Sequence, residues 1–347
     1  MKAIFKSINN VGIVVKDVDE VVKSFADKYG LGPWSIEDIG PENVSDMRVE
    51  GEKADYRIRV ASCSLRDIKL ELIQPLDNIS SYAKFLSNHG ENLHHIGYGI
   101  EDYEKTLGFL KDRGMDELQS GNFHGKNPYT YLKSERELKH IIKLEKKDPG
   151  YFKSKTNRYG FSWSTFPEPK KLYPPYENQE EMMPPVLKEL SQVSFIVKDV
   201  DAMVRLYYDV YGIGPWKTWI FSPETVDDMT IFGRNHGYKM RLALTKIDGI
   251  EFELIQPLDD VSIYYKFLKE EGEGFHHLGY LVEEYDKKIE YMKKIGVKIS
   301  MSGVWMGKHS WVYLTTDKDL KHIIELNHDQ KDFVPPDPLE TYPAESK

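Results

Sequence analysis

The sequence predicts an α+β protein made of two tandem copies of one domain, with two βαβββ-like modules in each copy. The first observation is an internal repeat, because residues 8–147 recur without a gap as residues 190–329. The second is the order of local patterns inside a copy: a short apolar strand, a helix and several strands, met twice. A period this long indicates a duplicated domain rather than a solenoid.

The elements of the first copy follow from hydrophobic spacing and from helix start and stop signals. A helix is expected to begin at the capping residue Asp19 and to end at Gly30. A second helix is expected over residues 101–114. Strands are expected over residues 11–15, around Met47, and over residues 56–62, 69–73, 95–100, 129–132 and 140–144. The same elements are expected in the second copy.

The repeat divides the chain into four parts. Residues 1–147 form the first domain and residues 188–330 the second. Residues 148–187 are rich in proline and tyrosine and lack a sustained period, so we expect a linker that packs on a domain. The proline-rich tail, residues 331–347, is expected to be an extended appendage.

Composition limits the class of protein. The chain has 347 residues, 40% hydrophobic and 30% charged, which is typical of a globular protein. Its net charge of −9 gives no electrostatic footprint for nucleic acid or an anionic membrane. The single cysteine, Cys63, and the lack of a signal-peptide pattern at the N-terminus favour a cytoplasmic protein. We expect a small-molecule substrate as partner, and the chain could pair as a homodimer.

Two apolar strands in each copy carry polar residues. Glu71 and Glu253 lie in the repeated Glu-Leu-Ile-Gln-Pro-Leu strand, where an unpaired carboxylate is unfavourable. Each therefore either faces water at a sheet edge or helps to hold a cation. A His-His pair starts a later strand in each copy. Strand alternation places His94 and His276 on the opposite face from their neighbours, so these two are expected to be structural.

These motifs resemble the vicinal oxygen chelate superfamily, which includes glyoxalase I, bleomycin-resistance proteins, methylmalonyl-CoA epimerase and extradiol dioxygenases. Glu-Leu-Ile-Gln-Pro-Leu followed by Gly-Glu-x-x-His-His is most similar to the methylmalonyl-CoA epimerase-like members. The resemblance covers both copies. It implies that two βαβββ modules form a cup-shaped mixed sheet around a divalent metal, with ligands from the first and last strand of each module.

The resemblance implies a metal site in the second copy. The four ligand positions there are Gln192, Glu253, His277 and Glu325. This set is similar to that of glyoxalase I of the human kind. Two carboxylates, an imidazole and an amide make an oxygen-rich shell, which favours one divalent Co, Ni, Mn, Zn or Mg ion per chain over Fe.

In the first copy the same positions indicate a degenerate site. They hold Asn10, Glu71, His95 and Lys143. A protonated lysine repels a cation, so we expect Lys143 to form an ion pair with Glu71. This assignment assumes that each copy closes its own cup; if modules paired across copies, the two sets of residues would mix.

The implied activity is proton transfer next to a carbonyl through a metal-stabilised enolate, as in an epimerase, isomerase or lyase. Glu253 and Glu325 are candidate proton carriers. Five further residues are candidates for the site. Each also has an ordinary structural explanation, because surface cations are usually solvated and aromatic residues usually belong to the core. The candidates are Lys239 as a base, His309 as a proton shuttle, Arg241 as an anion anchor, and Trp305 and Trp311 as pocket walls.

Two other functions remain open at this point. One is a tandem-domain non-haem dioxygenase of the extradiol or 4-hydroxyphenylpyruvate type. Gln192 argues against it, because such iron sites favour two histidines and one carboxylate. The other is a non-catalytic small-molecule binding protein of the bleomycin-resistance type.

Overall fold

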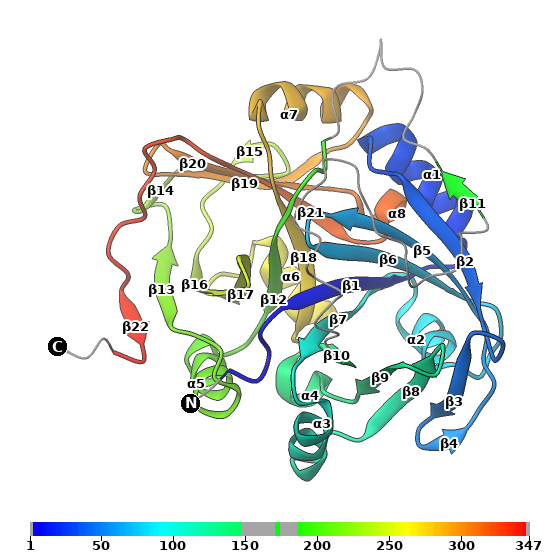
Figure 1. The fold of residues 1–347 in the computed structure, drawn as a ribbon. Helices are drawn as coiled ribbons and strands as arrows, with labels where there is room; N and C mark the ends of the chain where they lie inside the picture. The colour runs from blue at the N-terminus through cyan, green and yellow to red at the C-terminus, as the bar shows by residue number, and fades with distance from the viewer. Residues whose placement is uncertain (1–2, 147–170, 174–185, 345–347) are drawn as a thin grey trace.

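The computed structural model describes residues 3–146, 171–173 and 186–344, and within them each copy builds its own curled mixed sheet (Figure 1). Both sheets have 11 strands. Their orders are β11-β2-β5-β6-β1-β7-β10-β9-β8-β3-β4 and β15-β14-β19-β20-β21-β18-β12-β17-β16-β13-β22. Modules therefore pair within a copy and not across copies.

The elements of the first copy alternate as the repeat predicts. Its helices are α1 (Val18–Tyr29), α2 (Ser81–His89), α3 (Tyr103–Asp112) and α4 (Glu135–Leu138). Its strands are β1 (Ile8–Val14), β2 (Trp34–Ile39), β3 (Val44–Val49), β4 (Glu52–Lys53), β5 (Ile58–Leu65), β6 (Ile68–Pro75), β7 (Asn92–Ile100), β8 (Glu117–Phe123), β9 (Asn127–Leu132), β10 (Ile141–Lys146) and β11 (Lys171–Tyr173).

The second copy repeats this order. Its helices are α5 (Val200–Tyr211), α6 (Ile263–Glu270), α7 (Tyr285–Lys294) and α8 (Asp317–Leu320). Its strands are β12 (Leu190–Ile196), β13 (Trp216–Phe221), β14 (Val226–Ile231), β15 (Arg234–Asn235), β16 (Met240–Ile247), β17 (Ile250–Pro257), β18 (Gly274–Leu281), β19 (Ile299–Trp305), β20 (His309–Leu314), β21 (Ile323–Asp329) and β22 (Glu340–Tyr342). None of the helices in the described ranges is long and apolar enough to cross a membrane.

The first helix begins earlier than expected. Asp17, not Asp19, is its N-cap, with an extended backbone and a side chain that accepts a hydrogen bond from the Glu20 amide. The expected stop at Gly30 is confirmed, since this residue adopts the left-handed conformation at φ 65°. The sequence reading missed α2, which begins after the capping residue Ser80, and it missed β2 and β8.

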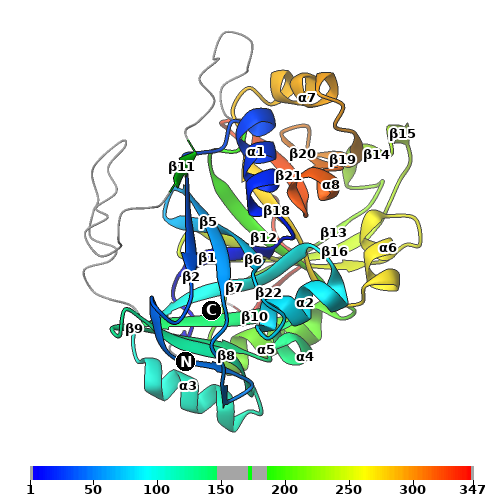
Figure 2. The same cartoon turned by 90° about the vertical axis from the view of Figure 1, so that its right-hand side faces the viewer.

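One hydrophobic core joins the two copies. Its buried side chains include Phe25 of α1 and Phe195 of β12, and the His140 ring lies 4.8 Å from that of Phe195. Helices α1 and α8 lie against each other at this interface (Figure 2). Two equivalent ion pairs cross it, Lys139 with Glu273 at 3.0 Å and Lys321 with Glu91 at 3.1 Å. The copies are therefore related by an approximate two-fold arrangement.

The C-terminal tail is not an appendage, which corrects the expectation from its prolines. Strand β22 adds to the sheet edge beside β13, with Trp216 paired to Tyr342. Strand β11 adds to β2 in the same way in the first copy. In each copy, a short strand from the segment that follows the domain thus forms one edge of the sheet. The remainder of the predicted linker, residues 148–170 and 174–185, lies outside the described residues.

Candidate metal centre

Four adjacent strands of the C-terminal sheet bring the predicted metal ligands together. In the order β21-β18-β12-β17 they carry Glu325, His277, Gln192 and Glu253. The ladder places His277 beside Ser194 and Ser194 beside Glu253, so these side chains share one face. Gly279 stands opposite Gln192, and a Cβ there would lie 2.4 Å from Gln192 Oε1. A glycine is thus what lets the glutamine side chain reach across its neighbouring strand.

The acid and imidazole groups form a tight, buried cluster. His277 Nε2 lies 3.1 Å from Glu325 Oε2 and 3.4 Å from Glu253 Oε2. One ligand atom from each of these three residues falls within 4.8 Å of the others. All three side chains are buried, and Glu253 Oε2 makes no hydrogen bond, although His277 forms an ion pair with it. A buried carboxylate oxygen without a hydrogen bond is unfavourable, and a divalent cation between these donors would stabilise it.

The local charges shift the pKa values of the three groups apart. Burial, together with neighbouring Glu325, raises the pKa of Glu253. Burial acts the same way on Glu325, but His277, Tyr313 and Asn327 outweigh it and lower the pKa of that carboxyl. Burial disfavours the charged form of His277, but the two carboxylates raise its pKa to about 9. Without a cation, a proton on His277 therefore balances part of the negative charge.

One residue of this centre, Asn327, was missed by the sequence reading, whereas His276 was expected to have a structural role. Asn327 Nδ2 donates to Gln192 Oε1 at 3.3 Å and to Glu325 Oε2 at 3.2 Å, so it holds two of the proposed ligands. His276 Nδ1 lies 2.9 Å from His277 Nδ1 and fixes the ring that presents Nε2 to the carboxylates. The signal for Asn327 was available, because it lies two positions after Glu325 on the same strand and so on the same face.

The N-terminal cup holds an ammonium group at the equivalent place. Lys143 Nζ lies 3.3 Å from Glu71 Oε2 and 2.7 Å from Glu145 Oε1, as the predicted ion pair with Glu71 requires. Asn10 donates to Glu145 at 3.0 Å, and His95 Nε2 lies 3.2 Å from Asn10 Oδ1. Burial disfavours the charged amine, but the Glu145 and Glu71 carboxylates outweigh it and raise the pKa of Lys143. A positive charge is thus already built into this cup.

The structure does not bring Lys239 and Arg241 to the cluster. Arg241 pairs with Gln256 on the ladder, and Leu244 pairs with Glu253, so the arginine projects from the opposite face. It binds Asp201 and Glu340 at 2.6 and 2.7 Å. Lys239 is exposed on the same outer side. Alternation along β16 therefore corrects the suggested roles of both residues as base and anion anchor.

His309, Trp305 and Trp311 lie on the concave side of the sheet. Trp311 pairs with Asn327 on the ladder and so shares the face of the cluster. His309 lies farther toward the end of β20, where its Nδ1 is 2.5 Å from Asp329 Oδ1. His309 is therefore not part of the cluster of Glu253, His277 and Glu325, which is called the acid–imidazole group below.

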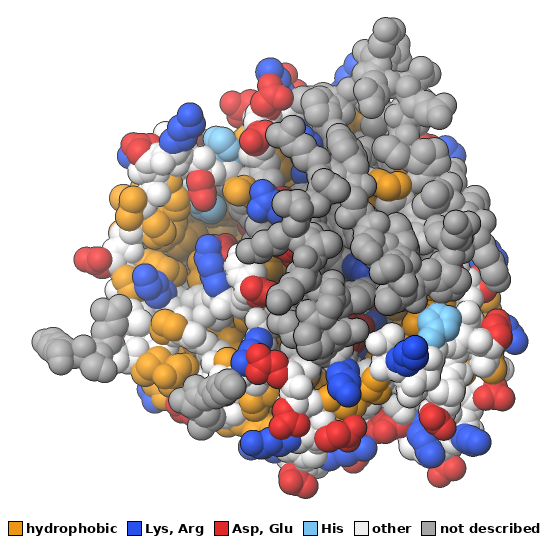
Figure 3. Space-filling model, in the orientation of Figure 1, with side chains coloured by type: hydrophobic (Ala, Val, Ile, Leu, Met, Phe, Trp, Pro, Cys, Tyr) orange, Lys and Arg blue, Asp and Glu red, His pale blue; other side chains and the backbone are white. Residues whose placement is uncertain are grey.

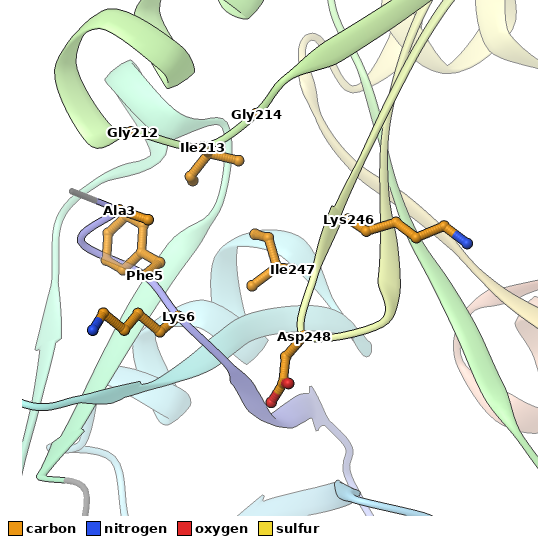
Figure 4. Close-up of a pocket in the computed structure, with 9 residues that line it drawn as sticks. All are labelled: Ala3, Phe5, Lys6, Gly212, Ile213, Gly214, Lys246, Ile247 and Asp248. Carbon is orange, nitrogen blue, oxygen red and sulfur yellow. The ribbon is translucent and has the colours of Figure 1, made fainter. Parts of the chain in front are cut away.

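A separate cavity of about 330 Å³ lies where the N-terminal segment meets the second copy (Figure 4). Its lining includes Phe5, Ile213 and Ile247, whose side chains point toward one another. Lys6 at its edge is paired with Glu101 at 2.7 Å. The cavity contains none of the predicted ligands and is distinct from the candidate centre.

Comparisons with known proteins match both copies. The family model for the glyoxalase/bleomycin resistance protein/dioxygenase superfamily matches residues 9–131 and 191–315. No curated protein sequence matches the chain. Among solved structures, a triple mutant of 4-hydroxymandelate synthase from Streptomyces coelicolor is 14% identical, with a TM-score of 0.54, over 95% of this chain and 94% of that chain. This likeness shows a shared two-copy fold.

Single-copy structures are also similar. A methylmalonyl-CoA epimerase from Streptomyces coelicolor is 21% identical over 41% of this chain and 97% of its own, with a TM-score of 0.32. The enzyme of that name from Mycobacterium tuberculosis is 18% identical over 43% and 93%, with a TM-score of 0.34. The family match spans most of both copies, and the chain belongs to the glyoxalase/bleomycin resistance protein/dioxygenase superfamily.

Proposed function

We propose that the chain is a metal-dependent enzyme of the glyoxalase/epimerase type, which transfers a proton next to a carbonyl of a small oxygenated substrate. The observation that supports this most is the buried group of Glu253, His277 and Glu325, in which one carboxylate oxygen makes no hydrogen bond. Gln192 would complete the donor set. A divalent ion held there would act as a Lewis acid that polarises a substrate carbonyl.

Within this set, Glu253 is the proposed proton carrier and Glu325 the fixed anchor. Glu325 Oε2 accepts hydrogen bonds from His277 and Asn327, which hold it in place. Glu253 Oε2 makes no hydrogen bond and has a 3.4 Å ion-pair contact with His277, so as an ion ligand it would be the one to detach and turn toward a substrate. A general base must lie within hydrogen-bond reach of the proton that it removes.

A dioxygenase is less well supported. The described centre offers one imidazole and two carboxylates, whereas non-haem iron oxygenases use two histidines and one carboxylate. The fold shared with 4-hydroxymandelate synthase does not alter this donor set.

The test compares two substitutions in the centre with one in the other cup. Glu253→Gln should keep the bound ion but lose at least about 100-fold in solvent deuterium exchange next to the carbonyl, as expected for loss of a general base. Glu325→Gln should lose both the exchange activity and the bound ion. Glu71→Gln, at the position equivalent to Glu253 in the other cup, is the matched control and should keep both. Wild-type protein would be loaded with Ni²⁺, Zn²⁺ or Mn²⁺ and assayed with α-keto acids, acyl-CoA thioesters and thiol adducts of α-ketoaldehydes.

Three outcomes contradict the proposal. Exchange that survives Glu253→Gln removes the assigned base. Oxygen consumption in place of exchange favours the dioxygenase. Tight ligand binding by a protein that takes up no ion favours a binding function.

A further inference from the structure

Within the proposed function, we infer that the C-terminal cup takes an aromatic substrate and not a phosphorylated carrier such as a coenzyme A thioester. This preference follows from the side chains on the concave face around the acid–imidazole group. Figure 3 shows a hollow lined mainly by hydrophobic side chains over β13, β14 and β16.

Aromatic rings line this face from the cluster outward. The Tyr313 ring lies 4.9 Å from the His277 ring, so the wall starts beside a proposed ligand. Farther out, Phe221 of β13 lies 4.6 Å from Trp305 of β19, and Trp219 lies 5.8 Å from the same ring. Strands β13 and β19 are far apart in the sheet order, so these contacts close the wall across the curled sheet.

The aromatic wall extends to the C-terminal tail. Phe333 lies 5.8 Å from Trp305 and 5.3 Å from His309 between ring centroids. Trp219 Nε1 donates to the Pro336 carbonyl at 3.1 Å. The returning tail thus lies over the same rings, with its first residues at the edge of the hollow.

The outer part of the wall is smaller in the N-terminal cup, although its Tyr131 lies 4.9 Å from His95 just as Tyr313 lies from His277. The positions equivalent to Trp219, Phe221, Trp305 and Trp311 hold Glu37, Ile39, Phe123 and Tyr129. Three of the six tryptophans of the chain therefore lie in the cup that keeps the acid–imidazole group, and their counterparts are smaller or charged. Core packing alone does not require this difference, because both sheets close with the same strand order.

The charges around the wall disfavour a polyanionic ligand. In the described part of the chain, the buried lysines are Lys143, in the other cup, and Lys288, in α7, and no arginine is buried. A phosphate group inside the C-terminal cup would thus find no buried ammonium or guanidinium, and desolvating it would be costly. An aromatic ring gains from stacking on tryptophan and from leaving water. The geometry therefore suits a compound with a ring beside two neighbouring oxygens.

The experiment uses a ligand pair that differs only in the ring. Benzoylformate and pyruvate share the same α-keto acid head and charge, and acetyl-CoA represents the carrier class. Their affinities for the metal-loaded full chain would be measured by titration calorimetry. Benzoylformate should bind about 30-fold more tightly than pyruvate, as expected from burying the additional apolar surface of a phenyl group.

Two variants place N-terminal residues in the C-terminal wall. Phe221→Ile should reduce the preference for benzoylformate about 5-fold, and Trp219→Glu should abolish it, with circular dichroism to verify folding. Phe123→Ala in the other cup is the control and should leave the preference unchanged. Equal affinities for the two acids in wild type, or tighter binding of acetyl-CoA, would overturn the inference. Ion content measured on the same samples tests the proposed metal centre separately, because it needs no organic ligand.

Discussion

Exchanging two residues of the N-terminal cup should give the chain a second divalent-cation site. The variant combines Lys143→Glu with Glu145→Asn, which copies the residues at positions 325 and 327 of the second copy. Glu71 and His95 are already in place, with His95 Nε2 3.9 Å from Glu71 Oε2. Two substitutions thus change the ammonium-filled cup into one with two carboxylates and an imidazole.

The cost of the exchange follows from the buried ion pairs. In the wild-type cup, Lys143 lies 3.3 Å from Glu71 and 2.7 Å from Glu145. Breaking a buried pair by removing one partner costs about 3–5 kcal/mol. The variant leaves two carboxylates facing each other. We therefore expect its free energy of unfolding, measured with a chelator present, to fall by about this amount. A cation at about 100 times its dissociation constant returns about 2.7 kcal/mol. Metal should therefore raise the melting temperature of the variant more than that of wild type.

The assay is the ion content of dialysed protein, with affinities from calorimetry. Wild type should bind one ion per chain and the variant two. The reverse exchange, Glu325→Lys with Asn327→Glu, should bind none and should form the lysine pairs seen in the first copy. Lys143→Met is the control that removes the ammonium without supplying a ligand. A folded variant that still binds a single ion would refute the conclusion that these two positions decide between ammonium and metal.

Two further predictions concern the C-terminal centre. The carboxylates outweigh burial and raise the pKa of His277 to about 9, so ion binding at pH 7 should release about one proton, measured as the dependence of calorimetric enthalpy on buffer ionisation. In the ion-free protein, protonated His277 also contributes to the free energy of unfolding. This contribution is fully present below about pH 6.5 and is lost as the pH rises through about 9. A free energy of unfolding that does not change over this pH range would contradict the prediction. Asn327→Ala removes the hydrogen bonds to Gln192 and Glu325 and should weaken ion affinity about 10- to 100-fold, with Glu145→Ala as the comparison. Unchanged affinity would show that Asn327 does not orient the ligands.

The repeat and the strand patterns predicted the duplicated fold because both depend on local spacing. The pairing of modules within each copy is confirmed by the sheet orders. Lys239 and Arg241 were assigned to the site by analogy of position, but alternation along β16 turns them outward. That outcome depends on the register between β16 and β17, which no local pattern fixes. Alternation indicates that Asn327 shares the face of Glu325, but its hydrogen bond to Gln192 depends on the pairing of separate strands and could not be predicted.

The shared core gives the N-terminal copy a structural role that does not depend on a metal site. Helix α1 of the first copy packs on α8 of the second, and the buried rings of His140 and Phe195 meet at another contact between the copies. The paired contacts of Lys139 with Glu273 and of Lys321 with Glu91 use equivalent residues on both sides. Removing the first copy would expose this apolar surface, at about 25 cal/mol for each Å². The N-terminal copy therefore stabilises the protein whether or not its cup binds a cation, because its packed surface lies on the side opposite the cup. Lys143 places a positive charge at the position of Glu325, and Glu145 and Glu71 neutralise it.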